Sequence, residues 1–129
     1  MPHCILEASD NLLDAPDWGA LLRDLHGALT ATGLFREADL KSRVILHPIF
    51  RVGDGAPDRA FVTLDVQIMD GRDDAAKTRI SEALMAVLAP AFPRSAAGMR
   101  LNLTVQVSEL HRASYRRQTT GPAAPQEAP

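Results

Sequence analysis

A proline follows the initiator methionine of this 129-residue chain, which begins MPHCILEASD. A small residue at position two normally lets the cell remove Met1, so we expect the mature chain to begin with Pro2 and a free secondary amine. The pKa of an α-amine is about 8 in short peptides, and burial or nearby cations lower it because both disfavour the charged form. Pro2 is therefore a candidate proton carrier near neutral pH. The alternative is that it only protects the N-terminus.

Other side chains that could do chemistry give weaker signals. Cys4 is the single cysteine, which excludes an internal disulfide, and its place in an apolar strand predicts a buried side chain rather than a nucleophile. His3 and His47 are expected to pack or hydrogen-bond within strands, and His26 and His111 have no partners at metal-ligand spacing. No spaced glycines form a phosphate-binding motif. We expect neither a metal nor a cofactor.

The first half of the chain has the pattern of a strand, a helix and a second strand. The apolar residues 3–8 predict a strand, and Asp14 is predicted to cap a helix. That helix has an apolar stripe between Leu21 and Thr32 and ends before Gly33. The run VILHPIFR, residues 44–51, is rich in β-branched and aromatic residues and predicts the second strand.

The second half repeats this pattern. Residues 61–68 alternate between apolar and polar side chains, which predicts a strand with one buried face. Asp73 or Asp74 can cap a helix that stops near Pro90, and residues 101–108 alternate again as a fourth strand. Similar spacing of the strands in the two halves indicates a duplicated motif.

These elements predict an α+β fold built as a tandem β-α-β repeat. Right-handed crossovers place both helices on one face of a four-stranded sheet. The opposite, semi-polar face would remain uncovered, which indicates assembly with other copies. We expect one domain over residues 1–117, with halves of about 2–52 and 60–110. The tail 118–129 is rich in Pro, Ala and polar residues and is predicted to be disordered.

Charge and hydropathy exclude several classes of partner. The formal net charge of -2 gives no general attraction to nucleic acid or to an acidic membrane surface. No apolar run approaches the ~18 residues of a membrane span, and no secretory leader precedes the first strand. We therefore expect a cytoplasmic protein without nucleic-acid or membrane partners.

Short motifs spread over nearly the whole domain resemble one known family. In order and spacing from Pro2 to Arg117, they are similar to the 5-carboxymethyl-2-hydroxymuconate isomerases of the tautomerase superfamily, whose relatives include 4-oxalocrotonate tautomerase and macrophage migration inhibitory factor. The resemblance implies a homotrimer whose assembly would cover the open sheet face. The motifs are Pro2 before a strand, Glu7-Ala8-Ser9-Asp10-Asn11, Ala31-Thr32-Gly33, Ser42-Arg43-Val44, Ala60-Phe61-Val62, Gly71-Arg72 and Glu109-Leu110-His111.

The resemblance also implies a cofactor-independent isomerase. Its substrate would be 5-carboxymethyl-2-hydroxymuconate, a dienol acid in the bacterial breakdown of homoprotocatechuate, converted to its 2-oxo isomer. Pro2 would carry the proton from the dienol oxygen to a remote carbon. The expected ligand is thus a small anion with two or three carboxylates.

Three cationic residues are implied as substrate ligands. Arg72 matches a substrate-binding arginine of the family, although it could instead be a solvated turn residue paired with nearby aspartates. Lys41 stands where the family has its other arginine, which keeps the charge but loses the planar fork that binds a carboxylate through two hydrogen bonds. Arg43 could help from two residues on.

Two alternative functions remain open from the sequence. The lysine at position 41 favours a tautomerase with a different keto-enol substrate. In another class, the chain would be a trimeric binding protein without chemistry, and Pro2→Ala would then change nothing beyond stability.

Overall fold

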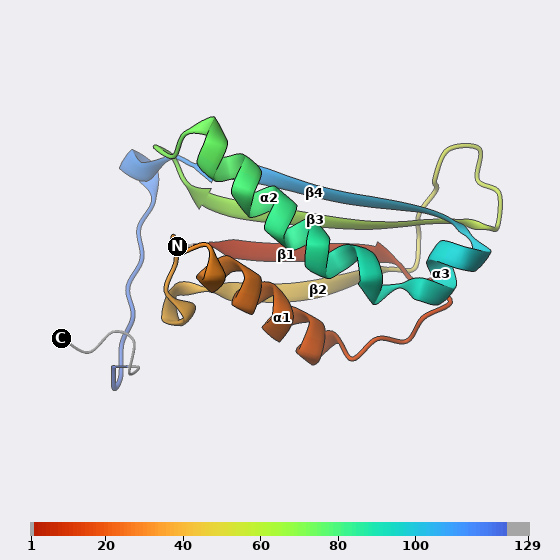
Figure 1. The fold of residues 1–129 in the computed structure, drawn as a ribbon, viewed down its shortest axis with the longest axis horizontal. Coiled ribbons are helices and arrows are strands. Elements are labelled where there is room, and N and C mark those ends of the chain that lie inside the picture. The colour runs from red at the N-terminus through yellow and green to blue at the C-terminus, as the bar shows by residue number, and fades with distance from the viewer. Residues whose placement is uncertain (1, 124–129) are drawn as a thin grey trace.

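A single mixed sheet with helices on one face makes up the computed structural model, which describes residues 2–123 (Figure 1). Three short 3-10 turns lie at Glu37–Asp39, Ala89–Ala91 and Arg112–Ser114. The helices and strands, in chain order, are β1 His3–Ser9, α1 Trp18–Ala31, β2 Lys41–His47, β3 Arg59–Met69, α2 Asp74–Leu88, α3 Pro93–Gly98 and β4 Arg100–Leu110.

The sheet has the order β2-β1-β3-β4. Each half of the chain contributes one parallel pair, β1 with β2 and β3 with β4, and the halves join through the antiparallel pair β1 and β3. Helices α1 and α2 lie side by side across one face (Figure 1). The predicted tandem β-α-β fold is confirmed.

The core lies between the sheet and the helices, as the alternation of side chains predicts. Cys4, Leu6 and Ala8 of β1 are fully buried on this side. Burying a leucine side chain contributes roughly 2 kcal/mol, so the leucine-rich stripes of both helices dominate this layer. The opposite face is polar at its centre, where Asp65 accepts a hydrogen bond from Ser108 at 2.8 Å. The remaining core residues include Val62, Leu64, Val66, Leu21, Leu25, Leu29, Ile80, Leu84 and Leu88.

The cap of α1 differs from the prediction. Asp17, not Asp14, accepts the N–H of Ala20 at 3.0 Å and starts the helix. Asp14 instead accepts the backbone N–H groups of Arg94 and Ser95 at 2.9 and 2.8 Å, at the start of α3. Sequence spacing alone could not reveal this, because α3 lies about 80 residues further along the chain. The second helix is capped by Asp73, one of the two predicted residues.

The second strand exists, but its bounds differ from the prediction. β2 runs from Lys41 to His47 rather than over residues 44–51, in parallel register with β1 from His3 to Ser9. Pro48 cannot donate a ladder hydrogen bond, so the strand ends before it. The shift places Lys41 at the start of the strand, beside His3.

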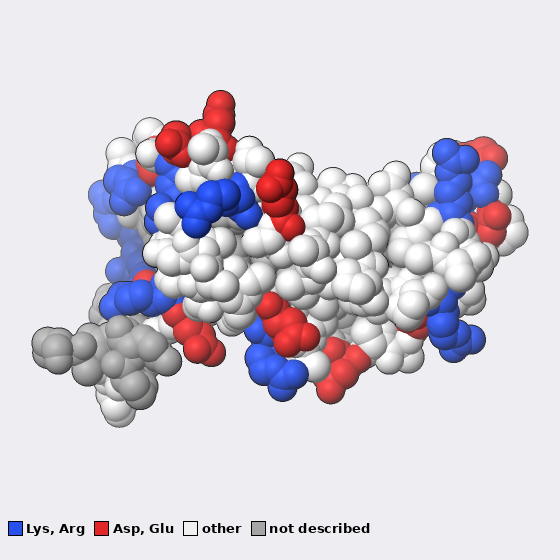
Figure 2. Space-filling model, viewed as in Figure 1, with Lys and Arg blue, Asp and Glu red and all other residues white. Residues whose placement is uncertain are grey.

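Charged side chains gather at both ends of the helix-covered face, and the broad middle of this face is largely uncharged (Figure 2). None of the described helices combines the length and apolar composition needed to cross a membrane. Of the predicted tail, residues 118–123 are exposed and form no helix or strand, and residues 124–129 lie outside the described part of the chain.

Candidate active site

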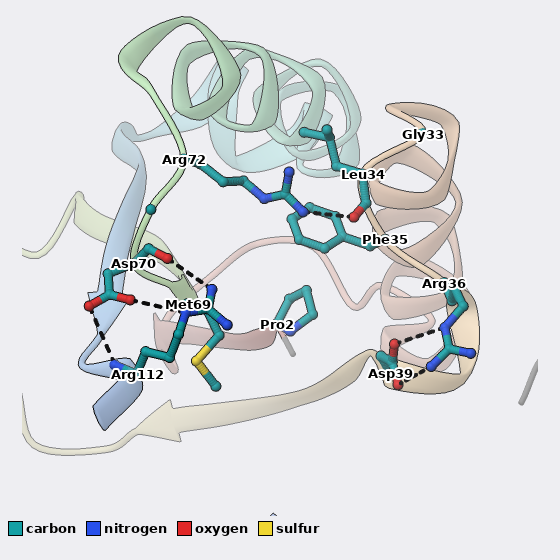
Figure 3. A pocket seen from close by; sticks show the side chains of 11 residues that line it. Pro2, Gly33, Leu34, Phe35, Arg36, Asp39, Met69, Asp70, Arg72 and Arg112 are labelled. Carbon is teal, nitrogen blue, oxygen red and sulfur yellow. Dashed lines mark hydrogen bonds and ion pairs between the residues drawn. The ribbon is translucent and has the colours of Figure 1, made fainter. Parts of the chain in front are cut away.

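The strand topology brings four distant segments together at one end of the sheet. Because β1 and β3 are antiparallel, the start of β1 lies beside the end of β3. Because each outer strand runs parallel to its neighbour, the start of β2 and the end of β4 reach the same end. A cavity of ≈ 630 Å³ opens there (Figure 3). Its lining residues are Pro2, Gly33, Leu34, Phe35, Arg36, Asp39, Met69, Asp70, Gly71, Arg72 and Arg112.

Pro2 lies at the centre of this cavity wall. The residue is fully buried, and its carbonyl oxygen accepts the backbone N–H of Lys41 at 3.2 Å. This hydrogen bond ties the start of β1 to the start of β2, so the proline ring does not fray from the sheet. In Figure 3 the ring lies at the centre of the lining side chains, with Arg72 and Phe35 above it and the guanidinium of Arg112 to its left.

Arg72 reaches the cavity from the turn between β3 and α2. Gly71 has a φ of 112°, a backbone conformation that favours glycine and directs the chain around this turn. The guanidinium donates from Nη2 to the carbonyl oxygen of Leu34 at 3.0 Å and lies 5.0 Å from the ring centroid of Phe35. Such a cation–π contact contributes about 0.5–2 kcal/mol. The position of Arg72 is therefore set by a loop that follows α1.

The expected alternative for Arg72, a turn arginine paired with acidic neighbours, does not describe this geometry. Among residues 2–123, the recorded contacts of its guanidinium are with Leu34 and Phe35 and not with an aspartate. A carbonyl oxygen and an aromatic ring orient the guanidinium without cancelling its positive charge. Arg72 can therefore still attract an anion.

Lys41 and Arg43 lie on the other face of the sheet. In the register of β1 and β2 they pair with His3 and Ile5, whose side chains alternate with the buried Cys4 and point away from the helices. Burial lowers the pKa of His3, and the two nearby cations lower it further, in agreement with this placement. Burial and the charge of Arg117 lower the pKa of Lys41. Neither cation lines the Pro2 cavity of its own chain.

Several lining residues escaped the sequence analysis. Arg36 is paired with Asp39, with 3.2 Å between Nε and Oδ2, and Asp39 is also paired with Arg117 at 3.1 Å. Burial alone would raise the pKa of Asp39, but the hydrogen bonds from Arg117 and Arg36 outweigh it and lower the pKa. Arg112 follows β4 and contacts Asp70. These residues follow directly after the ends of strands or helices. Because the topology brings those ends to the same end of the sheet, their positions in the sequence could have indicated that they line the cavity.

The surroundings of Cys4, His3 and His47 indicate structural rather than catalytic roles. Cys4 is fully buried, and burial raises the pKa of its thiol to about 11, so it is not a nucleophile at neutral pH. His3 is 3.2 Å from the Tyr115 hydroxyl, and His47 is 2.9 Å from Glu7. Within residues 2–123, no three His, Cys, Asp or Glu side chains are arranged to hold a metal ion.

Comparison with known proteins places this geometry in context. Residues 2–121 match the model of the protein family described as 5-carboxymethyl-2-hydroxymuconate isomerase. The chain is 32% identical over 111 residues to the 5-carboxymethyl-2-hydroxymuconate Delta-isomerase of Escherichia coli, covering 86% of this chain and 88% of that protein.

Solved structures agree with the sequence comparison. The crystal structure of a 5-carboxymethyl-2-hydroxymuconate isomerase from Deinococcus radiodurans R1 matches with a TM-score of 0.85 and 32% identity, covering 92% of this chain and 90% of that one. A fused 4-OT symmetric trimer matches with a TM-score of 0.66 and 13% identity, covering 90% of this chain and 93% of that one, which shows a shared fold.

Proposed function

Because the chain belongs to the 5-carboxymethyl-2-hydroxymuconate isomerase family and is an isomerase of the tautomerase type, we propose that it converts 5-carboxymethyl-2-hydroxymuconate to its 2-oxo isomer, with Pro2 as the proton carrier. The observation that supports this role is that Pro2 and Arg72 share the wall of one cavity. This reaction would serve the cytoplasmic breakdown of homoprotocatechuate.

The proposed reaction needs one base that takes up a proton and returns it. Once Met1 is removed, the neutral amine of Pro2 accepts the proton of the 2-hydroxyl group. The O–H bond breaks, the 2-oxo group forms, and electron density moves along the conjugated chain to a remote carbon. The protonated amine then delivers the proton to that carbon and returns to its neutral form. No cofactor is required, because the proton count balances within the substrate and Pro2.

Two features of the cavity suit the amine to this task. The buried position of Pro2 disfavours a charged amine, and the guanidinium groups of Arg72 and Arg112 beside it disfavour it further. We therefore expect the pKa of the amine to lie below its usual value of about 8. Arg72 would bind the carboxylate beside the 2-oxo group and stabilise the negative charge that develops on the oxygen.

We further propose that the active enzyme is a homotrimer. Trimers occur in the shared fold, as in the fused 4-OT structures. The open sheet face carries polar groups such as Asp65 and would be covered by neighbouring copies. Lys41 and Arg43 point to this open face, so their role as carboxylate ligands would require the cavity of a neighbouring copy.

Turnover of defined dienol acids tests this function. Ultraviolet absorbance follows the ketonisation of 2-hydroxymuconate and of its 5-carboxymethyl derivative by protein whose intact mass shows the loss of Met1. We expect turnover of both compounds, a preference for the carboxymethyl compound, and a loss of roughly 10²- to 10⁴-fold in Pro2→Ala. Equal activity of the variant would overturn the role of Pro2. If the protein converted only other keto-enol acids, the proposed reaction class would stand and the proposed substrate would be overturned.

A further inference from the structure

Arg112 is a second arginine beside Pro2 that the sequence motifs did not indicate. It lies in the 3-10 turn Arg112–Ser114 that follows β4, and its guanidinium enters the cavity from the Asp70 side. Figure 3 shows both guanidinium groups beside Pro2, that of Arg72 above the ring and that of Arg112 to its left. The two cations line the same cavity at separate positions, so each can engage a different carboxylate of one anion bound over Pro2.

Asp70 fixes the orientation of Arg112 through both backbone and side chain. The Nη2 of Arg112 donates to the Asp70 carbonyl oxygen at 3.0 Å, and its backbone N–H donates to Oδ2 at 3.4 Å. The Nε atom lies 3.5 Å from Oδ1. Among the described residues, Nη1 has no recorded partner, so the outer edge of the guanidinium remains available to a ligand. The side chain is 68% exposed, and an anion can reach it from solvent.

The other cations near the cavity are less suited to the far end of a substrate. The carboxylate of Asp39 pairs with two guanidinium nitrogens of Arg36, whereas the carboxylate of Asp70 pairs with the guanidinium of Arg112 through Nε alone, at 3.5 Å. Lys41 and Arg43 lie on the opposite face of the sheet in the same chain. In one chain, Arg112 is therefore the cation best placed to complement Arg72 beside Pro2.

We propose that Arg112 binds a second carboxylate of the substrate and so selects dicarboxylate and tricarboxylate dienols over monocarboxylates. Arg72 takes the 2-oxo acid end, and Arg112 takes the carboxylate at the far end of the conjugated chain. A planar guanidinium offers a carboxylate two parallel hydrogen bonds, which adds orientation to charge. This role rests on the proposed function, because it assigns the two ends of that substrate.

The test compares Arg112→Gln with wild type on two dienols that share the reacting end. One is 2-hydroxymuconate, and the other is 2-hydroxypenta-2,4-dienoate, which lacks the far carboxylate. We expect kcat/KM for 2-hydroxymuconate to fall roughly 10- to 100-fold, mainly through KM, as expected for the loss of a hydrogen bond between charged groups. The value for the monocarboxylate should fall far less, because Arg112→Gln then changes only the charge near the Pro2 amine and removes no contact with the substrate. Arg112→Lys should show an intermediate loss, because it keeps the charge without the fork.

Arg23→Gln is the matched control, since Arg23 is an exposed arginine on α1 away from the cavity. It should leave both substrates unaffected. An equal fall of kcat/KM on both dienols in Arg112→Gln would show a general structural effect and overturn the selectivity role. Unchanged kinetics on both would overturn it as well.

A binding measurement separates this inference from the proposed function. Calorimetry with adipate and hexanoate, a saturated dicarboxylate and its monocarboxylate counterpart, requires no turnover. One outcome is that wild type converts neither dienol and still binds adipate more tightly than hexanoate. If Arg112→Gln then removes that preference, the binding role of Arg112 is supported and the proposed substrate is overturned. If the variant keeps the preference, the role of Arg112 fails whatever the enzyme converts.

Discussion

Two cavities of nearly equal volume lie at opposite ends of the sheet and differ in chemistry. The Pro2 cavity measures ≈ 630 Å³, and the far cavity, beside the starts of β3 and β4, measures ≈ 640 Å³. Both are lined by arginine and aspartate. In the far cavity, however, Arg59 is paired with the carboxylates of Asp54 and Asp58. In the Pro2 cavity, a carbonyl oxygen and an aromatic ring hold Arg72.

Volume and charged lining residues alone do not define a site in this molecule. The ionisable acid of the far cavity is Asp54, and the hydrogen bond from Ala56 and the charge of Arg59 lower its pKa, so it is a poor base near neutral pH. The Pro2 cavity combines a candidate base with the guanidinium of Arg72, which has no recorded carboxylate partner within residues 2–123. A candidate proton carrier beside an accessible cation, rather than cavity volume, distinguishes the two ends.

The largest expected effect comes from blocking the amine while keeping the proline ring. A variant with one extra residue between Met1 and Pro2, chosen so that Pro2 carries a peptide nitrogen, should lose roughly 10²- to 10⁴-fold in kcat/KM. A peptide nitrogen is not basic. The measurement is ketonisation kinetics together with intact mass. A one-residue insertion after Gly53, in the far cavity, serves as the control and should retain activity.

The next effect separates the arginines of the two cavities. Arg72→Ala should lower kcat/KM by roughly 10²- to 10³-fold, as expected when a group that stabilises developing charge is removed. Arg59→Ala breaks the ion pairs with Asp54 and Asp58 at the far end and should leave kcat/KM unchanged. Steady-state kinetics and thermal unfolding of both variants check this. Similar losses of activity would remove the distinction between the cavities.

A smaller effect should come from the ring that supports Arg72. Phe35→Leu keeps an apolar side chain but removes the cation–π contact at 5.0 Å. We expect kcat/KM to fall roughly threefold to tenfold, which corresponds to the loss of a cation–π contact of about 1 kcal/mol. The melting temperature should stay close to that of wild type. Phe61→Leu, which alters a ring near the far end, should not change kcat/KM.

The smallest expected effect is a difference in acid sensitivity. Burial lowers the pKa of His26, which lies 2.8 Å from Ser42, below the usual 6.5. The unfolded chain therefore binds a proton at His26 more readily than the folded chain does. The contribution of His26 to the free energy of unfolding is complete above pH 6.5 and is lost as the pH falls below this value. Asp54 has a pKa below 3.8, so its contribution persists until far more acidic conditions.

Urea unfolding at about pH 5 and about pH 8 measures this difference. His26→Gln should reduce the loss of unfolding free energy between the two pH values. Asp54→Asn should leave that loss unchanged. A wild-type protein that is equally stable at both pH values, with unchanged behaviour in His26→Gln, would contradict the placement of a half-buried, neutral His26.

The sequence predicted the parts of the fold that follow from local patterns. Strict alternation located β3 and β4, and the polar face at Asp65 followed from the same pattern. The start of β2 was wrong because its register depends on pairing with β1, which no local pattern encodes. Asp14 was assigned to the wrong helix for a similar reason, since its partners Arg94 and Ser95 are distant in the chain.

The site was predictable only where chemistry marks a residue by itself. Pro2 stands out through its position, and Arg72 was found by resemblance. Arg112 and Phe35 reach the cavity through strand order and through the loop after α1, so their part depends on tertiary structure. The same topology places Lys41 on the far face of the sheet, which sequence position could not show.

Titration of the Pro2 amine tests directly whether Pro2 can act as the base near neutral pH. Nitrogen NMR of protein labelled with ¹⁵N-proline reports the protonation of this amine as pH changes. We predict a pKa below about 8 for this amine in wild type, and a higher value in Arg72→Ala because a nearby cation has been removed. A wild-type pKa at or above about 8, or a Pro2 nitrogen that does not titrate, would contradict the role of Pro2 as the base.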